Sequence, residues 1–157
     1  MKKEQGIFTS NPEKAASRVA INGVMLGSIF VMLAVVFLEH DNFHPMAITQ
    51  LVLSIPFLFV SSLAYAKIGY WKDTKHWDSF GYFTNTFGNF FVINAIGLIS
   101  SGVSRVLAFS YFALIILLLL IYSYINISYT RSYVSKSFKF LLSLAIIFFG
   151  GILPLLR

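Results

Sequence analysis

Charged and apolar positions alternate along this chain in long blocks. Five stretches contain no charged residue, and they cover residues 19–38, 42–66, 79–104, 106–130 and 140–156. A helix needs about 20 predominantly apolar residues to cross about 30 Å of bilayer hydrocarbon, so each stretch spans or nearly spans. The pattern predicts an all-α integral membrane protein, one domain of five transmembrane helices over about 12–38, 46–66, 79–102, 105–128 and 137–156.

The third and fourth stretches are separated by Arg105 alone. One helix over both would be about twice the thickness of a bilayer, at about 1.5 Å per residue. Residues 100–104 read Ser-Ser-Gly-Val-Ser, which is a composition typical of a turn. The chain is therefore expected to reverse direction there.

The distribution of Lys and Arg predicts the orientation, because cytoplasmic loops are enriched in both. With a cytoplasmic N-terminus and five spans, the outer side holds only Arg105 and Arg157. The inner side then holds the other ten cations: Lys2, Lys3, Lys14, Arg18, Lys67, Lys72, Lys75, Arg131, Lys136 and Lys139. This asymmetry predicts a multi-pass protein of the plasma or inner membrane, with the C-terminus on the opposite side from the N-terminus.

Composition narrows the classes of function. The chain is 57% hydrophobic and only 11% charged, whereas soluble domains carry about 25% charged residues. Its lack of cysteine excludes disulfides and thiolate metal sites. Although the sequence pI is about 9.7, the cations lie at span ends, where orientation and anionic lipid headgroups explain them. We expect the bilayer as a partner, no nucleic acid and no cofactor.

Small residues form two stripes at helical spacing. The first span has Gly23 and Gly27, with alanines on the same face, and the third has Gly81, Gly88 and Gly102. Small residues let helix backbones approach closely in lipid. Both stripes are predicted to be packing seams, and internal packing is favoured over contact with another copy.

Uncharged polar residues follow one face of each of two spans. Two interpretations stay open: a lining for a neutral solute or monovalent ion, or hydrogen bonds between helices. A conduit would be lined by Asn85, Asn89 and Ser100 from the third span and by Gln50, Ser54 and Ser61 from the second.

The densest titratable cluster is the predicted outer loop at 39–44. Glu39, His40, Asp41 and His44 have the ligand types of a divalent metal site. Pro45 disfavours helix at His44, and a solvated loop explains the same residues. A metal-dependent membrane enzyme is the third hypothesis for the function.

The interiors of the five spans carry no charge, and the chain has no nucleotide-binding or hydrolase motif. The charged residues that proton relays and voltage sensors usually carry inside their spans are therefore missing from these spans. The first hypothesis is therefore a protein that is not an enzyme and acts by helix-helix assembly, as a subunit or an accessory or immunity-type factor. It would form a homo-oligomer or bind another membrane protein. The second hypothesis is a homo-oligomeric channel or transporter-like conduit.

Overall fold

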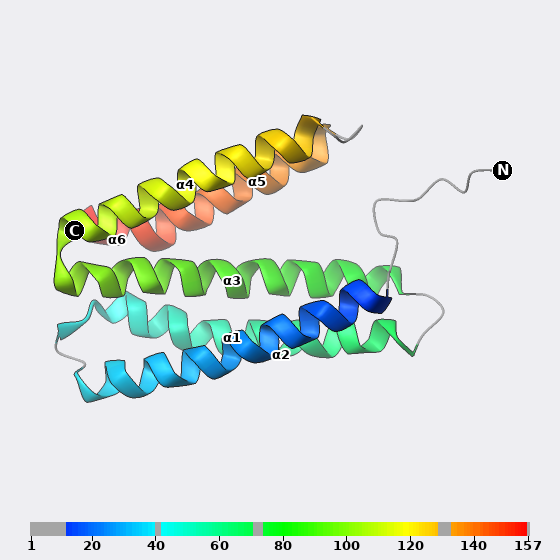
Figure 1. Cartoon of the computed structure of the whole chain (residues 1–157), viewed down its shortest axis with the longest axis horizontal. Coiled ribbons are helices and arrows are strands. Elements are labelled where there is room, and N and C mark those ends of the chain that lie inside the picture. The colour runs from blue at the N-terminus through cyan, green and yellow to red at the C-terminus, as the bar shows by residue number, and fades with distance from the viewer. Residues whose placement is uncertain (1–11, 40–41, 71–73, 129–132, 157) are drawn as a thin grey trace. The chain divides into compact units, whose positions relative to one another are not determined.

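The computed structural model of the chain describes residues 12–39, 42–70, 74–128 and 133–156, which are nearly all helical (Figure 1). Five of its helical stretches are long and apolar enough to cross a membrane, so the predicted count of spans is confirmed. The elements are α1 (Pro12–Leu38), α2 (Pro45–Ile68), α3 (Lys75–Val103), α4 (Arg105–Ser128), α5 (Tyr133–Ile147), the π-helical turn η2 (Phe148–Ile152) and α6 (Leu153–Leu156).

The helix ends follow from local chemistry. Proline opens α1 and α2, where its missing N–H and fixed φ suit the first helical position. Ser104 is the one residue between α3 and α4, and its hydroxyl accepts a hydrogen bond from the Leu107 N–H at 3.0 Å. This bond is an N-terminal cap for α4. The predicted reversal is therefore made by a single capping residue.

The chain divides into two compact units. Unit 1 comprises Met1–Phe37 and Leu51–Asn89, and unit 2 comprises Leu38–Gln50 and Phe90–Arg157. The division falls inside α2 and inside α3, so each of these helices contributes to both units. The units are described separately below.

In unit 1, α1 buries residues spaced seven apart: Ala15, Asn22, Ile29 and Val36. A seven-residue repeat keeps one face of a helix toward its neighbours. At the start of α1, Ala15 packs with Tyr65 and Ile68 of α2 in a small apolar cluster. Elsewhere in unit 1, the rings of Phe57 in α2 and Phe87 in α3 stack with their centroids 5.8 Å apart.

In unit 2, α4 and α5 run alongside each other (Figure 1). The core draws on all the helices of the unit and consists of Ala47, Phe90, Leu98, Ala108, Phe112, Ile147 and Leu155. Among the described residues of α4, only Ala108 and Phe112 are buried, and both lie near the start of the helix. Its aliphatic run from Leu114 to Ile121 is exposed at most positions, as expected of a face toward lipid.

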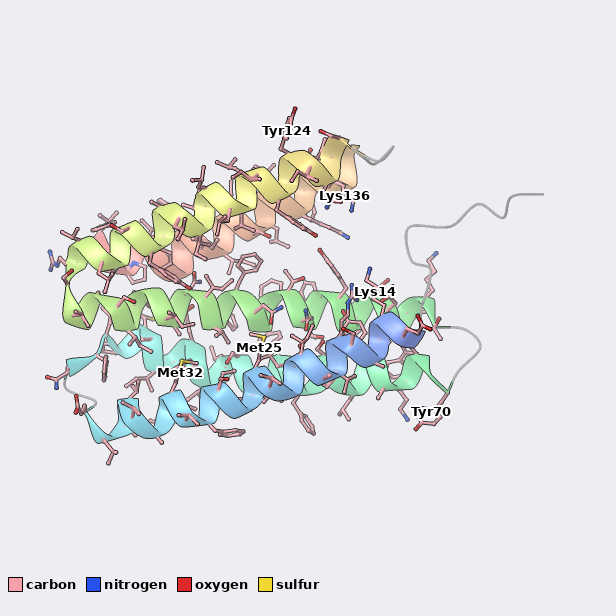
Figure 2. All side chains as sticks on the ribbon, in the orientation of Figure 1. Lys14, Met25, Met32, Tyr70, Tyr124 and Lys136 are labelled. Atoms are coloured by element: carbon pink, nitrogen blue, oxygen red, sulfur yellow. The ribbon has the colours of Figure 1, made fainter. Side chains whose placement is uncertain are left out.

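Figure 2 shows the side chains at the helix ends. Lys14 lies near the start of α1, and Tyr70 follows the end of α2 and is exposed. In unit 2, Tyr124 projects away from α4 near its end (Figure 2), and Lys136 donates a hydrogen bond to Asn126 at 2.9 Å. Exposed tyrosine and lysine at span ends suit the level of the lipid headgroups.

Candidate functional site

The charged cluster of unit 1 joins three helices through Arg18 of α1, Tyr65 of α2 and Asp78 of α3. Arg18 Nη1 donates to the Tyr65 hydroxyl at 2.6 Å and lies 3.5 Å from Asp78 Oδ1. The tyrosine is buried, and the Arg18 and Asp78 side chains are 24% and 16% exposed. Because both charges are partly shielded from water, their attraction is screened less than that of a surface pair.

This cluster was not found from the sequence. Arg18 and Asp78 flank the charge-free stretches, and only Arg18 was used there, as evidence for orientation. The helices extend beyond those stretches, so α1 and α3 include both residues. One signal was present: Arg18 and Asn22 lie four residues apart and therefore on one face of α1.

A chain of hydrogen bonds continues on the same helices of unit 1. Asn22 Nδ2 donates to Ser61 Oγ at 3.3 Å, and both side chains are buried. The Ser61 hydroxyl has acceptors at the Gly81 carbonyl, 3.0 Å away, and at Asn85 Oδ1, 3.4 Å away. One hydroxyl proton serves one acceptor at a time, so these two share it. The network links α1, α2 and α3 without a charge.

The buried polar cluster of unit 2, which we call the Gln50–Asn94 cluster, lies against the π-helical turn. Gln50 Nε2 donates to the Gly150 carbonyl at 2.5 Å, and Asn94 Nδ2 donates to the Ile146 carbonyl at 3.0 Å. Gln50 is 3% exposed and Asn94 is 0% exposed. Two side-chain amides from different helices therefore donate hydrogen bonds to backbone carbonyls of the last span.

Pro154 explains why the Gly150 carbonyl in this turn is free to accept a hydrogen bond from a side chain. In a regular α-helix the N–H of residue 154 would donate to the Gly150 carbonyl, but proline has no N–H. The turn from Phe148 to Ile152 is π-helical, and the Leu153 N–H donates to the Phe148 carbonyl. The last span therefore has an irregular turn, and the Gln50 side chain of α2 satisfies its Gly150 carbonyl.

The glycines of this turn make room for the cluster. A Cβ at Gly151 would lie 2.9 Å from Asn94 Oδ1, and a Cβ at Gly150 would lie 3.3 Å from Gln50 Oε1 and still closer to the Asn94 amide. Both amide oxygens are buried, and neither has a hydrogen-bond partner within the described part of the chain. The cluster thus holds two buried oxygens, without a partner among the described residues, beside the two glycines of the turn.

The six residues predicted to line a conduit have different partners, and that lining stays a prediction. Ser54 and Ser100 bond to carbonyls of their own helices, and Ser61 and Asn85 meet in the network of unit 1. Gln50 belongs to the cluster of unit 2. The Asn89 Oδ1 atom is buried in unit 1 and has no hydrogen-bond partner among the described residues.

Three glycines of α3 lie at close contacts. A Cβ at Gly81 would be 3.0 Å from the Tyr65 ring, and one at Gly88 would be 2.8 Å from the Leu58 side chain, both within unit 1. In unit 2, a Cβ at Gly102 would be 2.9 Å from the Asn42 carbonyl oxygen. These positions admit glycine because a neighbour already occupies the place of a side chain.

The glycines of α1 behave differently. A Cβ at Gly23 or at Gly27 would meet nothing within 4 Å among the described residues. We call the small residues of this face the α1 seam; its members are all exposed and comprise Ala16, Ala20, Gly23, Gly27 and Ala34. Within the described residues of unit 1, this seam packs against no other helix, and its predicted role as a packing seam stays a prediction. The buried face of α1 is a different stripe, which contains Asn22.

The predicted metal loop is only partly described. His40 and Asp41 lie outside the described residues, so the hypothesis stays a prediction. His44 Nδ1 accepts a hydrogen bond from the Met46 N–H at 3.2 Å. Among the described residues, no group of three or more His, Cys, Asp or Glu side chains could hold a metal.

A hollow of about 260 Å³ opens in unit 2 near the turn between α3 and α4, and we call it the end hollow. Its lining includes His44, Ser101, Arg105 and Pro154. Arg105 is its one permanently charged lining residue in the part of the chain that the structure describes.

Comparison with protein-family models, curated proteins and solved structures finds no match to this chain.

Proposed function

We propose that this protein is a polytopic membrane protein, not an enzyme, that acts by assembling with another transmembrane helix along the α1 seam. The partner belongs to a second copy of the chain or to another membrane protein that it serves as a subunit or accessory factor. The protein lies in the plasma or inner membrane, with its N-terminus in the cytoplasm.

The observation that carries the proposal is the exposure of the α1 seam. A Cβ at Gly23 or Gly27 would have open space around it among the described residues, so that part of the chain gives no packing reason for two glycines in the middle of a span. Association in lipid has little hydrophobic drive and depends on close backbone approach at small residues. Close approach of a partner helix would explain why Gly23 and Gly27 are glycines.

The position of the α1 seam on the helix supports the same conclusion. At about 100° per residue, the α1 seam lies about 140° around α1 from the buried stripe that contains Asn22 and Ile29. A helix can therefore pack on the seam without displacing the contacts of α1 within unit 1. Its members from Ala16 to Gly27 repeat every three to four residues, as in interfaces between transmembrane helices.

The mass and composition of the particle extracted from native membranes in native-lipid discs test the proposal. We expect either a defined homo-oligomer or a second membrane protein at fixed stoichiometry. A particle with one copy of this chain and no other protein, at native expression level, would contradict it.

A conduit for a small solute is the second candidate, and the free buried oxygen of Asn89 favours it. Flux of small neutral solutes and monovalent ions into vesicles containing the protein tests this function. Replacement of Asn85 and Asn89 by leucine should lower the flux if they line the path. Equal flux in the wild type and this variant would exclude that lining.

A further inference from the structure

The end hollow is a cavity of unit 2 with room for a bound group. Its volume of about 260 Å³ is that of about eight or nine water molecules, at about 30 Å³ each, so it can hold several heavy atoms. Gly102 shapes its wall, because a Cβ there would lie 2.9 Å from the Asn42 carbonyl oxygen. Pro154 and Leu155 of the last span add apolar lining.

The polar side chains that line the end hollow offer hydrogen-bond donors. Arg105 brings a guanidinium group, which has five N–H donors and no acceptor. His44 Nδ1 accepts a hydrogen bond from the Met46 N–H at 3.2 Å, so the proton of the neutral ring is on Nε2, and that nitrogen is a donor. Among the described residues of the lining there is no Asp or Glu. This donor set suits an anion and not a cation.

The charge of Arg105 is available to such an anion. Arg105 is exposed, and it forms no ion pair with another residue of the described part of the chain. With the N-terminus in the cytoplasm, Arg105 and Arg157 are the two cations of the outer side, where Lys and Arg are usually scarce. The orientation of the protein therefore gives no reason for a cation at Arg105, whereas a bound anion does.

The length of α4 places the end hollow at the level of the lipid headgroups. This helix begins at Arg105 and has 24 residues, so it is about 36 Å long at about 1.5 Å per residue. The hydrocarbon of a bilayer is about 30 Å thick, and the headgroup layers bring the total to about 40–45 Å. The ends of a span of this length lie in the headgroup layers, where the phospholipids carry their phosphate groups.

We propose that the end hollow binds a phosphate group, carried either by a phospholipid headgroup or by a small soluble phosphate. The Arg105 guanidinium donates paired hydrogen bonds to the phosphate oxygens, a geometry that arginine favours, and His44 Nε2 donates another. The apolar surface of Pro154 accepts the carbon atoms next to the phosphate. This site lies in unit 2 and does not involve the α1 seam, so it stands whether or not the protein acts by assembly.

The histidine rings provide a direct reporter, since the chain contains only His40, His44 and His76. With histidine labelled with ¹⁵N in the ring, NMR of the protein in dodecyl maltoside micelles shows these three residues, and the signal missing from His44→Gln is that of His44. The buffer contains no phosphate, and the protein is washed until mass spectrometry detects no bound phospholipid. His76, at the start of α3 and far from Ser101 of the lining, is the internal control.

Four probes separate the possible ligands. Glycerol 3-phosphate is the soluble phosphate, and short-chain phosphatidylglycerol is the phospholipid. Short-chain diacylglycerol is the comparison lipid because it has no phosphate, and sodium acetate tests for a general preference for anions. We expect the His44 signal to shift to saturation with a phosphate probe while the His76 signal stays in place. Tighter binding of phosphatidylglycerol than of glycerol 3-phosphate would identify a lipid headgroup as the ligand, and equal binding a soluble phosphate.

Two substitutions of one cation each test the role of Arg105. Arg105→Gln should weaken the midpoint by about tenfold to 100-fold, as for the loss of a charged hydrogen-bond donor. Arg105→Lys should fall between this variant and the wild type, because lysine keeps the charge but not the paired donors. Lys67→Gln is the matched control, because it removes one exposed cation near the end of α2 that is far from His44. Its midpoint should equal that of the wild type.

Three results from the wild-type protein would overturn the proposal, whatever the variants do. A His44 signal that responds to neither phosphate probe would mean that the end hollow binds no phosphate. An equal response to acetate would mean that it does not recognise phosphate among anions. A response to diacylglycerol equal to that of phosphatidylglycerol would mean that acyl chains, and not the phosphate, cause the shift. Equal midpoints in Arg105→Gln and the wild type would exclude Arg105 as the ligand-binding residue.

Discussion

Replacement of both Gly23 and Gly27 by isoleucine should abolish assembly while leaving the folded chain intact. A Cβ at either position meets nothing within 4 Å among the described residues, so the larger side chains extend into open space. We expect the free energy of unfolding of the isolated chain to change by about 0.5 kcal/mol or less, as for ordinary surface substitutions.

At an interface where a partner helix approaches closely, the same change is costly. Insertion of extra bulk into a packed contact costs about 1–3 kcal/mol per site, so the double variant should lose about 2–6 kcal/mol of association free energy. This loss weakens binding by about 30-fold to 10⁴-fold, at about 1.4 kcal/mol for each factor of ten.

The assay measures association in lipid, by energy transfer between labelled copies or by recovery of a co-purified partner. Stability of the same preparations is measured by detergent-induced unfolding. Ser28→Ile is the matched control: Ser28 is also exposed on α1, but it lies about 120° around the helix from the centre of the α1 seam. Its association should equal that of the wild type.

Two results would refute the reasoning. Unchanged association of the Gly23→Ile and Gly27→Ile double variant would mean that the α1 seam is not an interface. A large loss of stability in the monomeric variant would mean that the seam packs within the chain after all.

Three further predictions test the buried contacts, each by unfolding in mixed detergent micelles. Arg18→Ala and Asp78→Asn should each destabilise the chain by about 1–3 kcal/mol, and the double variant should lose less than the sum of the two; full additivity would mean that the pair does not interact. Gly88→Ala should cost about 1–3 kcal/mol, because its Cβ would lie 2.8 Å from a leucine of α2; a neutral effect would contradict the close packing. Gln50→Leu should cost about 1–3 kcal/mol because it strips a buried carbonyl of its donor, and Pro154→Ala should recover part of this loss by restoring a backbone N–H; no recovery would refute our account of the π-helical turn.

The helices themselves could be predicted from the sequence because their limits depend on local properties. Charged residues bound the apolar stretches, and Pro12 and Pro45 mark helix starts. The turn at Ser104 follows from the length that a bilayer allows. None of these features requires knowledge of which helix lies beside which.

The contacts between helices could not be predicted in this way. Helical spacing gives the face on which a residue lies, but not its neighbour. At about 100° per residue, Asn94 lies nearly opposite Asn85 on α3, and the structure has the two residues in different units with different partners. Spacing gave no sign that Asn94 would meet Gln50 at a π-helical turn.

The two glycine stripes illustrate the same limit. Small residues permit close approach by any helix, whether from the same chain or from another. A Cβ at Gly81 or Gly88 would meet a side chain of α2, whereas a Cβ at Gly23 or Gly27 would meet nothing within 4 Å among the described residues. The structure is needed to tell a stripe that packs against another helix of the chain from a stripe that does not.

The bond between Asn22 and Ser61 has a consequence for biosynthesis. Its two residues are 39 positions apart in the chain, and ribosomes add about 5–20 residues per second. The amide of Asn22 is therefore made about 2–8 s before the hydroxyl that receives it. During that interval α1 carries an unsatisfied amide near its middle, so it gains from staying beside the insertion machinery until α2 arrives. The first two helices should leave that machinery as a pair.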